Sequence, residues 1–367
     1  MKRLGVAAAI VDDVLVPGDI GVTDGVIDAV GLPGDGSGLA IPGMVDLQVN
    51  GYGGVDFLTA DDGGWTDAAR AMAREGVTAY VANLITSPEP LVSKALQAAD
   101  RMVRSERPGG AHLLGAHLEG PFLASTKAGT HPREHLRSPD LSLLERLLSA
   151  GPVVGVTLAP ELPGGLDLVR VLAERGVLVS LGHSAASGAQ AHAGFHAGAR
   201  TVTHVFNAMT TPTSREPGLA GVALTRPDVF VQLICDGVHL SWETAALVIA
   251  AARSRFVLVT DALSAAGAPD GDYWLGEDVE VLMRDGRARN RDGGLAGSVL
   301  SLAGALRGAV DAGASVEDAV AATTTRPADL LGRIDLGRLR PGDPADIVVL
   351  DDALSVSETL LAGVPVN

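Results

Sequence analysis

A regular alternation of short apolar runs with helix-like segments is the sequence feature that most constrains the fold. The apolar runs cover residues 44–49, 79–86, 112–119, 153–159, 178–184, 201–207, 230–236 and 256–261. The helix-like segments cover residues 65–75, 90–104, 142–148, 165–175, 187–197 and 241–254. About eight buried strands, each followed by a helix or loop over roughly 250 to 300 residues, are typical of a (β/α)8 barrel. We therefore predict an α/β protein built on a TIM-like barrel.

The two ends of the chain are predicted to form a second, smaller domain. Short strands bounded by turns are predicted at residues 6–11, 14–16, 26–30 and 346–350. We infer that both ends meet in a small β-sandwich flanking the barrel. The predicted divisions are residues 1–43 and 336–367 for this domain and 44–335 for the barrel. Within the barrel part, we predict an exposed hairpin at residues 273–291 and two further helices at 301–312 and 316–324.

Composition limits the partners and the location of the protein. The net charge of -16 and the pI near 4.9 argue against a surface for nucleic acid or an anionic membrane. The single cysteine, Cys235, excludes an intrachain disulfide and fits a reducing compartment. No apolar run approaches the roughly 20 residues of a membrane span, and the run at 5–11 is too short for a signal peptide. We expect a cytoplasmic protein.

Ionisable residues recur where the predicted strands end. Barrel enzymes place their chemistry at the carboxyl ends of the strands, so these side chains are expected to converge on one pocket. Any one of them alone also fits a structural role, as a salt-bridged glutamate or a hydrogen-bonded core histidine. Five such residues on five strands are harder to explain in that way. They are Glu119, His183, His204, His239 and Asp261.

One carboxylate and two imidazoles form a ligand set for a catalytic metal. Glu119, His183 and His204 supply three ligands and leave a position for water, as in catalytic zinc sites. The same set suits Fe(II), and affinity order alone does not exclude iron, cobalt or manganese. Asp261 is then the natural general base, although an aspartate there also fits a helix N-cap. An iron oxygenase and an inactive barrel that serves as a binding scaffold stay open as alternatives to a hydrolase.

Several motifs, in order and at compatible spacing between about Gly43 and Leu350, resemble one family. This is the N-acetylglucosamine-6-phosphate deacetylase family of the amidohydrolase superfamily. Single motifs are weak signals, whereas the ordered set is specific. The motifs are His117-Leu-Glu-Gly-Pro-Phe122, Gly129-Thr-His-Pro132, Leu181-Gly-His-Ser184, Thr203-His-Val-Phe-Asn-Ala-Met209, Arg215-Glu-Pro-Gly-Leu-Ala-Gly221, Asp236-Gly-Val-His239, Thr260-Asp-Ala262 and Leu295-Ala-Gly-Ser298.

The resemblance implies removal of acetate from N-acetyl-D-glucosamine 6-phosphate, in amino-sugar metabolism. It implies the metal ligands and the acid/base residue already named, and His131 as a donor to the acetyl carbonyl. It further implies a phosphate site made by Asn207, Ala208, Arg215 and His239, and a homodimer, because in some relatives the matching arginine crosses the subunit interface. Arg215 also fits a surface salt bridge with Glu216. An amidohydrolase with another substrate stays open.

The first predicted barrel strand departs from the superfamily pattern. Many amidohydrolases have His-x-His there, which binds a second metal, whereas this chain has Gln48-Val49-Asn50. Neutral amides are weak ligands for transition metals. The fourth run also lacks a lysine that could bridge two metals. We therefore predict one divalent metal per chain, zinc in the first instance, with Gln48, Asn50 and His117 next to its ligands.

Overall fold

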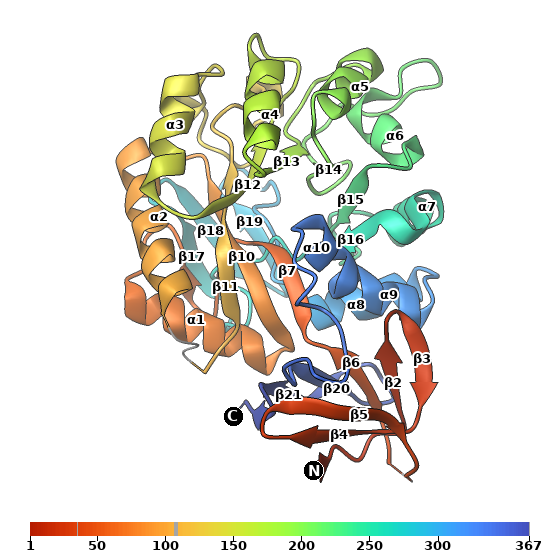
Figure 1. Ribbon diagram of the computed structural model, residues 1–367. Helices are drawn as coiled ribbons and strands as arrows, with labels where there is room; N and C mark the ends of the chain where they lie inside the picture. The colour runs from red at the N-terminus through yellow and green to blue at the C-terminus, as the bar shows by residue number, and fades with distance from the viewer. Residues whose placement is uncertain (35, 106–108, 367) are drawn as a thin grey trace.

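Eight parallel strands form the centre of the molecule (Figure 1). The structure is a computed structural model, and it describes residues 1–34, 36–105 and 109–366. The strands lie in the order β16-β15-β14-β13-β12-β11-β10-β7. They are β7 (Met44–Val49), β10 (Val77–Ile85), β11 (His112–Glu119), β12 (Val153–Leu158), β13 (Leu178–Leu181), β14 (Thr201–Val202), β15 (Phe230–Leu233) and β16 (Phe256–Leu258). The barrel predicted from the sequence is confirmed.

The ring closes where the segment after β16 meets β7. The backbone N–H of Asp261 donates to the carbonyl of Gln48 at 2.9 Å, and the N–H of Asn50 donates to Ala262 at 2.8 Å. Val49 and Ala262 form an isolated parallel bridge at the same place. These contacts of Asp261 and Ala262 complete a nearly closed barrel.

Helices surround the barrel and bury apolar faces against it (Figure 1). They are α1 (Asp62–Arg74), α2 (Glu89–Arg104), α3 (Leu141–Ala150), α4 (Gly165–Glu174), α5 (Gly188–His196), α6 (Gly218–Thr225), α7 (Trp242–Ala252), α8 (Leu302–Asp311), α9 (Val316–Thr323) and α10 (Thr325–Leu330), with short 3-10 turns η1 (Ser125–Lys127), η2 (Arg133–His135) and η3 (Arg253–Arg255). Side chains cap many of the amino ends. Ser187, for example, forms a reciprocal capping box with Gln190 at the start of α5.

Both chain ends contribute to the small domain, which lies at one end of the barrel (Figure 1). A six-stranded sheet has the order β22-β21-β20-β6-β2-β3, and a three-stranded sheet has the order β1-β4-β5. Ile20 and Ile27 of the smaller sheet share a buried cluster with Ile347 and Leu360 of the larger one. The strands are β1 (Lys2–Arg3), β2 (Ala8–Val11), β3 (Val14–Pro17), β4 (Asp19–Thr23), β5 (Val26–Leu32), β6 (Leu39–Pro42), β20 (Ile347–Leu350), β21 (Val356–Leu361) and β22 (Val364–Pro365). The exact domain boundaries stay a prediction.

The predicted hairpin at residues 273–291 is wrong in detail. The insertion is an antiparallel sheet of three strands, β17 (Gly271–Leu275), β18 (Val279–Arg284) and β19 (Arg287–Asn290). A two-stranded ribbon, β8 (Gly51–Tyr52) and β9 (Val55–Asp56), follows the first barrel strand. In the part of the chain that the structure describes, no helix has the length and apolar character needed to cross a membrane.

Candidate active site

A cavity of about 680 Å³ opens at the carboxyl ends of the barrel strands. Most of the residues predicted from the sequence to form a site line this one cavity. They are Asn50, Glu119, His131, His183, His204, Asn207, Ala208, His239 and Asp261. The expected convergence of strand-end residues is therefore observed.

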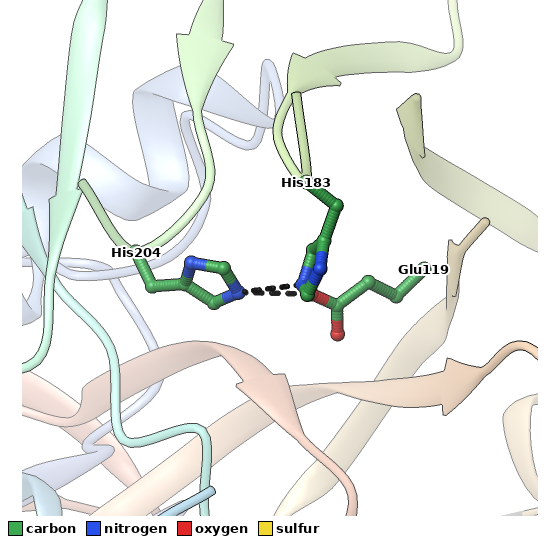
Figure 2. A group of neighbouring side chains, drawn as sticks. All are labelled: Glu119, His183 and His204. Carbon is green, nitrogen blue, oxygen red and sulfur yellow. Dashed lines mark hydrogen bonds and ion pairs between the residues drawn. The ribbon is translucent and has the colours of Figure 1, made fainter. Parts of the chain in front are cut away.

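Three of these side chains point toward a common centre (Figure 2). Nε2 of His183 and Nε2 of His204 each lie 3.0 Å from Oε1 of Glu119, and the two nitrogens are 3.2 Å apart. All three side chains are buried. A carboxylate and two imidazoles that converge in this way match the ligands of a divalent metal. The group fits a metal site by the chemistry of its donors and by their approach.

The chain orients His183 for this task. Its Nδ1 lies 2.8 Å from the backbone carbonyl of Lys127, which accepts only from a protonated nitrogen. Nε2 of the neutral ring is then unprotonated and has a lone pair directed at the centre. Burial by itself would raise the pKa of Glu119, but the adjacent imidazoles of His131, His183 and His204 hold that pKa well below its usual range. Glu119 therefore remains an anion.

Left-handed backbone conformations position three functional side chains. The φ angles are +47° at His183, +29° at His204 and +49° at Asp261. This region is unfavourable for residues with a Cβ, and residues held in it cluster at functional sites as well as in turns. At each of these positions the chain leaves its strand and turns over the barrel mouth. The barrel strands that precede them, β13, β14 and β16, end earlier than the sequence predicts for this reason.

A layer of side-chain amides connects the candidate metal ligands to Asp261. Nε2 of Gln48 donates to Oε2 of Glu119 at 3.3 Å and to Oδ1 of Asp261 at 3.2 Å. Nδ2 of Asn50 donates to the same Oδ1 at 2.8 Å. Nδ2 of Asn83 donates to Oε2 of Glu119 at 2.6 Å and to Oδ1 of Asn50 at 2.9 Å. Gln48 and Asn50 therefore lie beside the ligands as predicted, and Asn83 joins them.

Sequence reasoning did not identify Asn83. The sequence does contain a signal for it, a single amide in the apolar run at residues 79–86. A buried amide needs hydrogen-bond partners, so such a residue indicates other polar groups nearby. Thr86, at the end of the same run, was also missed. Its N–H donates to Nδ1 of His131 at 3.3 Å, and its hydroxyl donates to the carbonyl of Glu119 at 3.0 Å.

Asp261 presents one free carboxylate oxygen. Both amide donors bind Oδ1, and among the described residues no group donates to Oδ2. Burial raises the pKa of Asp261, and the negative charge of Glu119 raises it further. A carboxylate whose pKa lies above its usual range, with one oxygen free at a cavity wall, is suited to accept a proton and return it. The helix N-cap role is not seen, because the first helix after Asp261 is α8, which Ser301 caps.

His131 is oriented as a hydrogen-bond donor. Because Nδ1 accepts from Thr86, the proton of the neutral ring lies on Nε2, which is 3.8 Å from Oε1 of Glu119. Burial lowers the pKa of His131 to about 4, so the ring is neutral near pH 7. His131 can therefore donate to an oxygen in the cavity without adding charge.

His117 lies deeper in the barrel than the ligands. Its Nε2 is 2.7 Å from the hydroxyl of Thr157, which is itself 2.7 Å from the hydroxyl of Thr203. A Cβ on Gly155 would lie 2.9 Å from Nδ1 of His117, so the glycine makes room for the ring. Burial lowers the pKa of His117 to about 4. Its link to His204 passes through Thr203, the residue before that ligand.

The four residues assigned to a phosphate site do not all meet. Asn207, Ala208 and His239 line the cavity, and Nδ1 of His239 is 2.7 Å from Oδ2 of Asp236. Arg215 is exposed and does not line the cavity of its own chain. The alternative salt bridge with Glu216 is not seen among the described residues; Oε1 of Glu216 accepts from backbone N–H groups.

Comparison with known proteins places this site in a family. The model of the amidohydrolase family matches residues 39–366. The human N-acetylglucosamine-6-phosphate deacetylase is 38% identical over 89% of this chain and 83% of its own length. A Mycobacterium smegmatis enzyme of the same name, a mutant in complex with N-acetyl-D-glucosamine-6-phosphate, is 32% identical with a TM-score of 0.92, covering 98% and 97% of the two chains. The chain belongs to the N-acetylglucosamine-6-phosphate deacetylase family. An N-acetylgalactosamine-6-phosphate deacetylase of Escherichia coli O157:H7 is also 38% identical, over 93% of both chains.

The amides at the end of the first barrel strand distinguish this chain from many other amidohydrolases. Where many amidohydrolases have two histidines, Gln48 and Asn50 donate hydrogen bonds to carboxylates. A side chain that uses its N–H groups in this way orients Glu119 and Asp261 and adds no strong metal ligand. Among the described residues, Glu119, His183 and His204 are the only group of His, Cys, Asp and Glu found to have the geometry of a metal site.

Proposed function

We propose that this member of the family hydrolyses the acetamide of N-acetyl-D-glucosamine 6-phosphate to D-glucosamine 6-phosphate and acetate, with one divalent metal per chain. The observation that carries the proposal is the buried centre of Glu119, His183 and His204, which shares a cavity with the free oxygen of Asp261. The near-full-length likeness to deacetylases, one of them in complex with this substrate, supports it.

Glu119, His183 and His204 would hold the metal, which we propose to be zinc, with iron, cobalt or manganese as alternatives. When bound, such an ion polarises an amide carbonyl and lowers the pKa of a bound water. Stoichiometry of one follows from the use of Gln48 and Asn50 as hydrogen-bond donors. An iron oxygenase is disfavoured by the family to which the chain belongs.

The chain itself supplies proton transfer and charge stabilisation. Oδ2 of Asp261 takes the proton of the attacking water and then delivers it to the leaving nitrogen, while Gln48 and Asn50 hold Oδ1. Nε2–H of His131 donates to the acetyl oxygen as negative charge develops there. Buried walls such as Ile85 and Leu275 keep bulk water away from these groups.

The phosphate is proposed to lie in the same cavity, at Asn207, Ala208 and His239. Arg215 completes this site from the second subunit of a homodimer. Two observations support that arrangement: Arg215 is exposed, and it does not line the cavity of its own chain. The cytoplasmic location stays a prediction.

Acetate release from N-acetylglucosamine with and without its 6-phosphate tests the proposal. The wild-type protein should strongly prefer the phosphorylated sugar, and equal rates on both would contradict the substrate assignment. N-acetylgalactosamine 6-phosphate belongs in the same assay as the second candidate substrate, because a relative named for it matches 93% of this chain. Arg215→Ala should lose much of the preference for phosphate, since a charge-assisted hydrogen bond is worth about 10-fold or more in binding.

A further inference from the structure

A second cavity, of about 670 Å³, adjoins the substrate cavity. The two cavities share three lining residues, His239, Leu295 and Gly297. His239 therefore stands between the proposed phosphate position and this second space. The strand β19 forms part of the wall of the second cavity, through Arg287 and Ala288.

The substrate cavity is poor in fixed positive charge. Its described lining includes two carboxylates, Glu119 and Asp261, and no lysine or arginine. The whole chain has a net charge of -16. A phosphate dianion that enters such a site needs a cationic partner near its binding position. Among the described residues that line the two adjoining cavities, Arg287 is the only lysine or arginine.

Arg287 is also available for binding. Its neighbours on the inserted sheet are engaged: Arg284 bonds Asp272, Arg289 bonds the carbonyl of Gly293 and Arg291 pairs with Glu280. In the described part of the chain, the guanidinium of Arg287 has no hydrogen bond or ion pair, and the residue is exposed. An arginine without a partner at the wall of a cavity keeps all of its donors for a ligand.

The acidic neighbour in the second cavity does not compete for this arginine. Oδ2 of Asp236 contacts Nδ1 of His239, and Oδ1 accepts from the backbone N–H groups of Val238 and His239 at 2.8 Å each. Asp236 therefore orients His239, and it leaves the opposite nitrogen of that ring toward the cavities.

We propose that Arg287 is a substrate-binding residue that grips the 6-phosphate from the β19 side of His239, within the same chain. The inference rests on the proposed function, because it takes the phosphate monoester as the ligand. It assigns to one subunit a cation of its own, in addition to the Arg215 contributed by the partner. The guanidinium fork can donate twice to a phosphate, which a lysine cannot do in the same geometry.

The test compares Arg287→Ala and Arg287→Lys with wild type. For each protein, kcat/KM is measured on N-acetylglucosamine with and without its 6-phosphate, and inorganic phosphate is tested as a competitive inhibitor. Arg287→Ala should lower the ratio of the two kcat/KM values about 10-fold or more, mainly through KM, and weaken inhibition by phosphate to a similar degree. Arg287→Lys should recover part of both effects.

Arg289→Ala is the matched control. Arg289 lies on the same strand, is exposed and lines neither cavity, so its loss should change neither the ratio nor the inhibition. Thermal stability separates binding from folding effects, and Arg287→Gln replaces Arg287→Ala if the latter is unstable. A wild type that prefers the phosphorylated sugar, with Arg287→Ala keeping that preference and its inhibition by phosphate, overturns the inference alone. A wild type without the preference overturns the proposed function and this inference together.

Discussion

Asp261→Asn is the substitution that most directly separates proton transfer from structure. The amide is nearly isosteric with the carboxylate. Its oxygen can occupy the position of Oδ1 and accept from Gln48 and Asn50 at the observed 3.2 and 2.8 Å. Its NH2 group then takes the position of Oδ2, which has no donor among the described residues. The replacement therefore keeps both hydrogen bonds to Oδ1 and avoids opposing two donors at the other position, which lies at the cavity that Asp261 lines.

The expected loss of activity follows from the loss of proton transfer. General acid–base steps contribute about 10² to 10⁴ in rate, so kcat should fall by that factor. Metal content should stay unchanged, because the three ligands are untouched. Without metal, the thermal stability near pH 7 should stay equal or rise. Burial and the charge of Glu119 raise the pKa of Asp261, which means that its negative charge is unfavourable in the folded state, and the substitution removes that charge.

Three measurements on the same preparation decide the matter: acetate release, elemental analysis and thermal unfolding. Asp311→Asn serves as control, since Asp311 is an exposed carboxylate at the end of α8. Near-normal turnover of Asp261→Asn with its metal bound would refute the acid/base role. A metal content that falls together with activity would instead identify Asp261 as a ligand.

Three further substitutions test the surrounding site. Glu119→Gln removes the only anionic ligand and should abolish both metal binding and turnover; full metal content by elemental analysis would contradict this. Asn83→Ala removes donors to Glu119 and Asn50, and chelator competition should show metal affinity reduced about 10- to 100-fold, whereas unchanged affinity would argue against the orienting role. Burial raises the pKa of Asp46 to about 7, so the stability that its protonated form contributes is lost as the pH rises from about 4 through 7. In urea unfolding, the free energy of unfolding of Asp46→Asn should therefore increase relative to that of wild type between pH 5 and pH 7.5. A difference that does not change with pH would refute this.

The barrel could be predicted because parallel strands buried on both faces read as uninterrupted apolar runs. The short outer strands were harder to find. β4 and β21, for example, mix polar and apolar residues and depend on partners distant in sequence. Helix α6 was missed because its segment from Gly218 is apolar on all sides and gives no helical period.

The convergence of Glu119, His183 and His204 could be predicted because their residue types are rare at the ends of apolar runs. Their geometry could not, since the positive φ angles at His183 and His204 are imposed by the turns that follow the strands. Asn83 and Thr86 escaped notice for a related reason. Each carries one polar group in an apolar run, and the partners that explain them, Glu119 and His131, lie more than 30 residues away.

The barrel closes at Asp261, so the activity of the enzyme depends on the backbone contacts that close its fold. The backbone of this residue bonds β7, while its side chain lines the cavity. Side-chain substitutions leave these backbone bonds intact, but any fluctuation that separates the segment from β7 also displaces the proposed acid/base residue. On heating, activity should therefore be lost at a lower temperature than helical structure. Amide hydrogen exchange at Asp261 and Asn50 should accelerate at the temperature at which the barrel first opens.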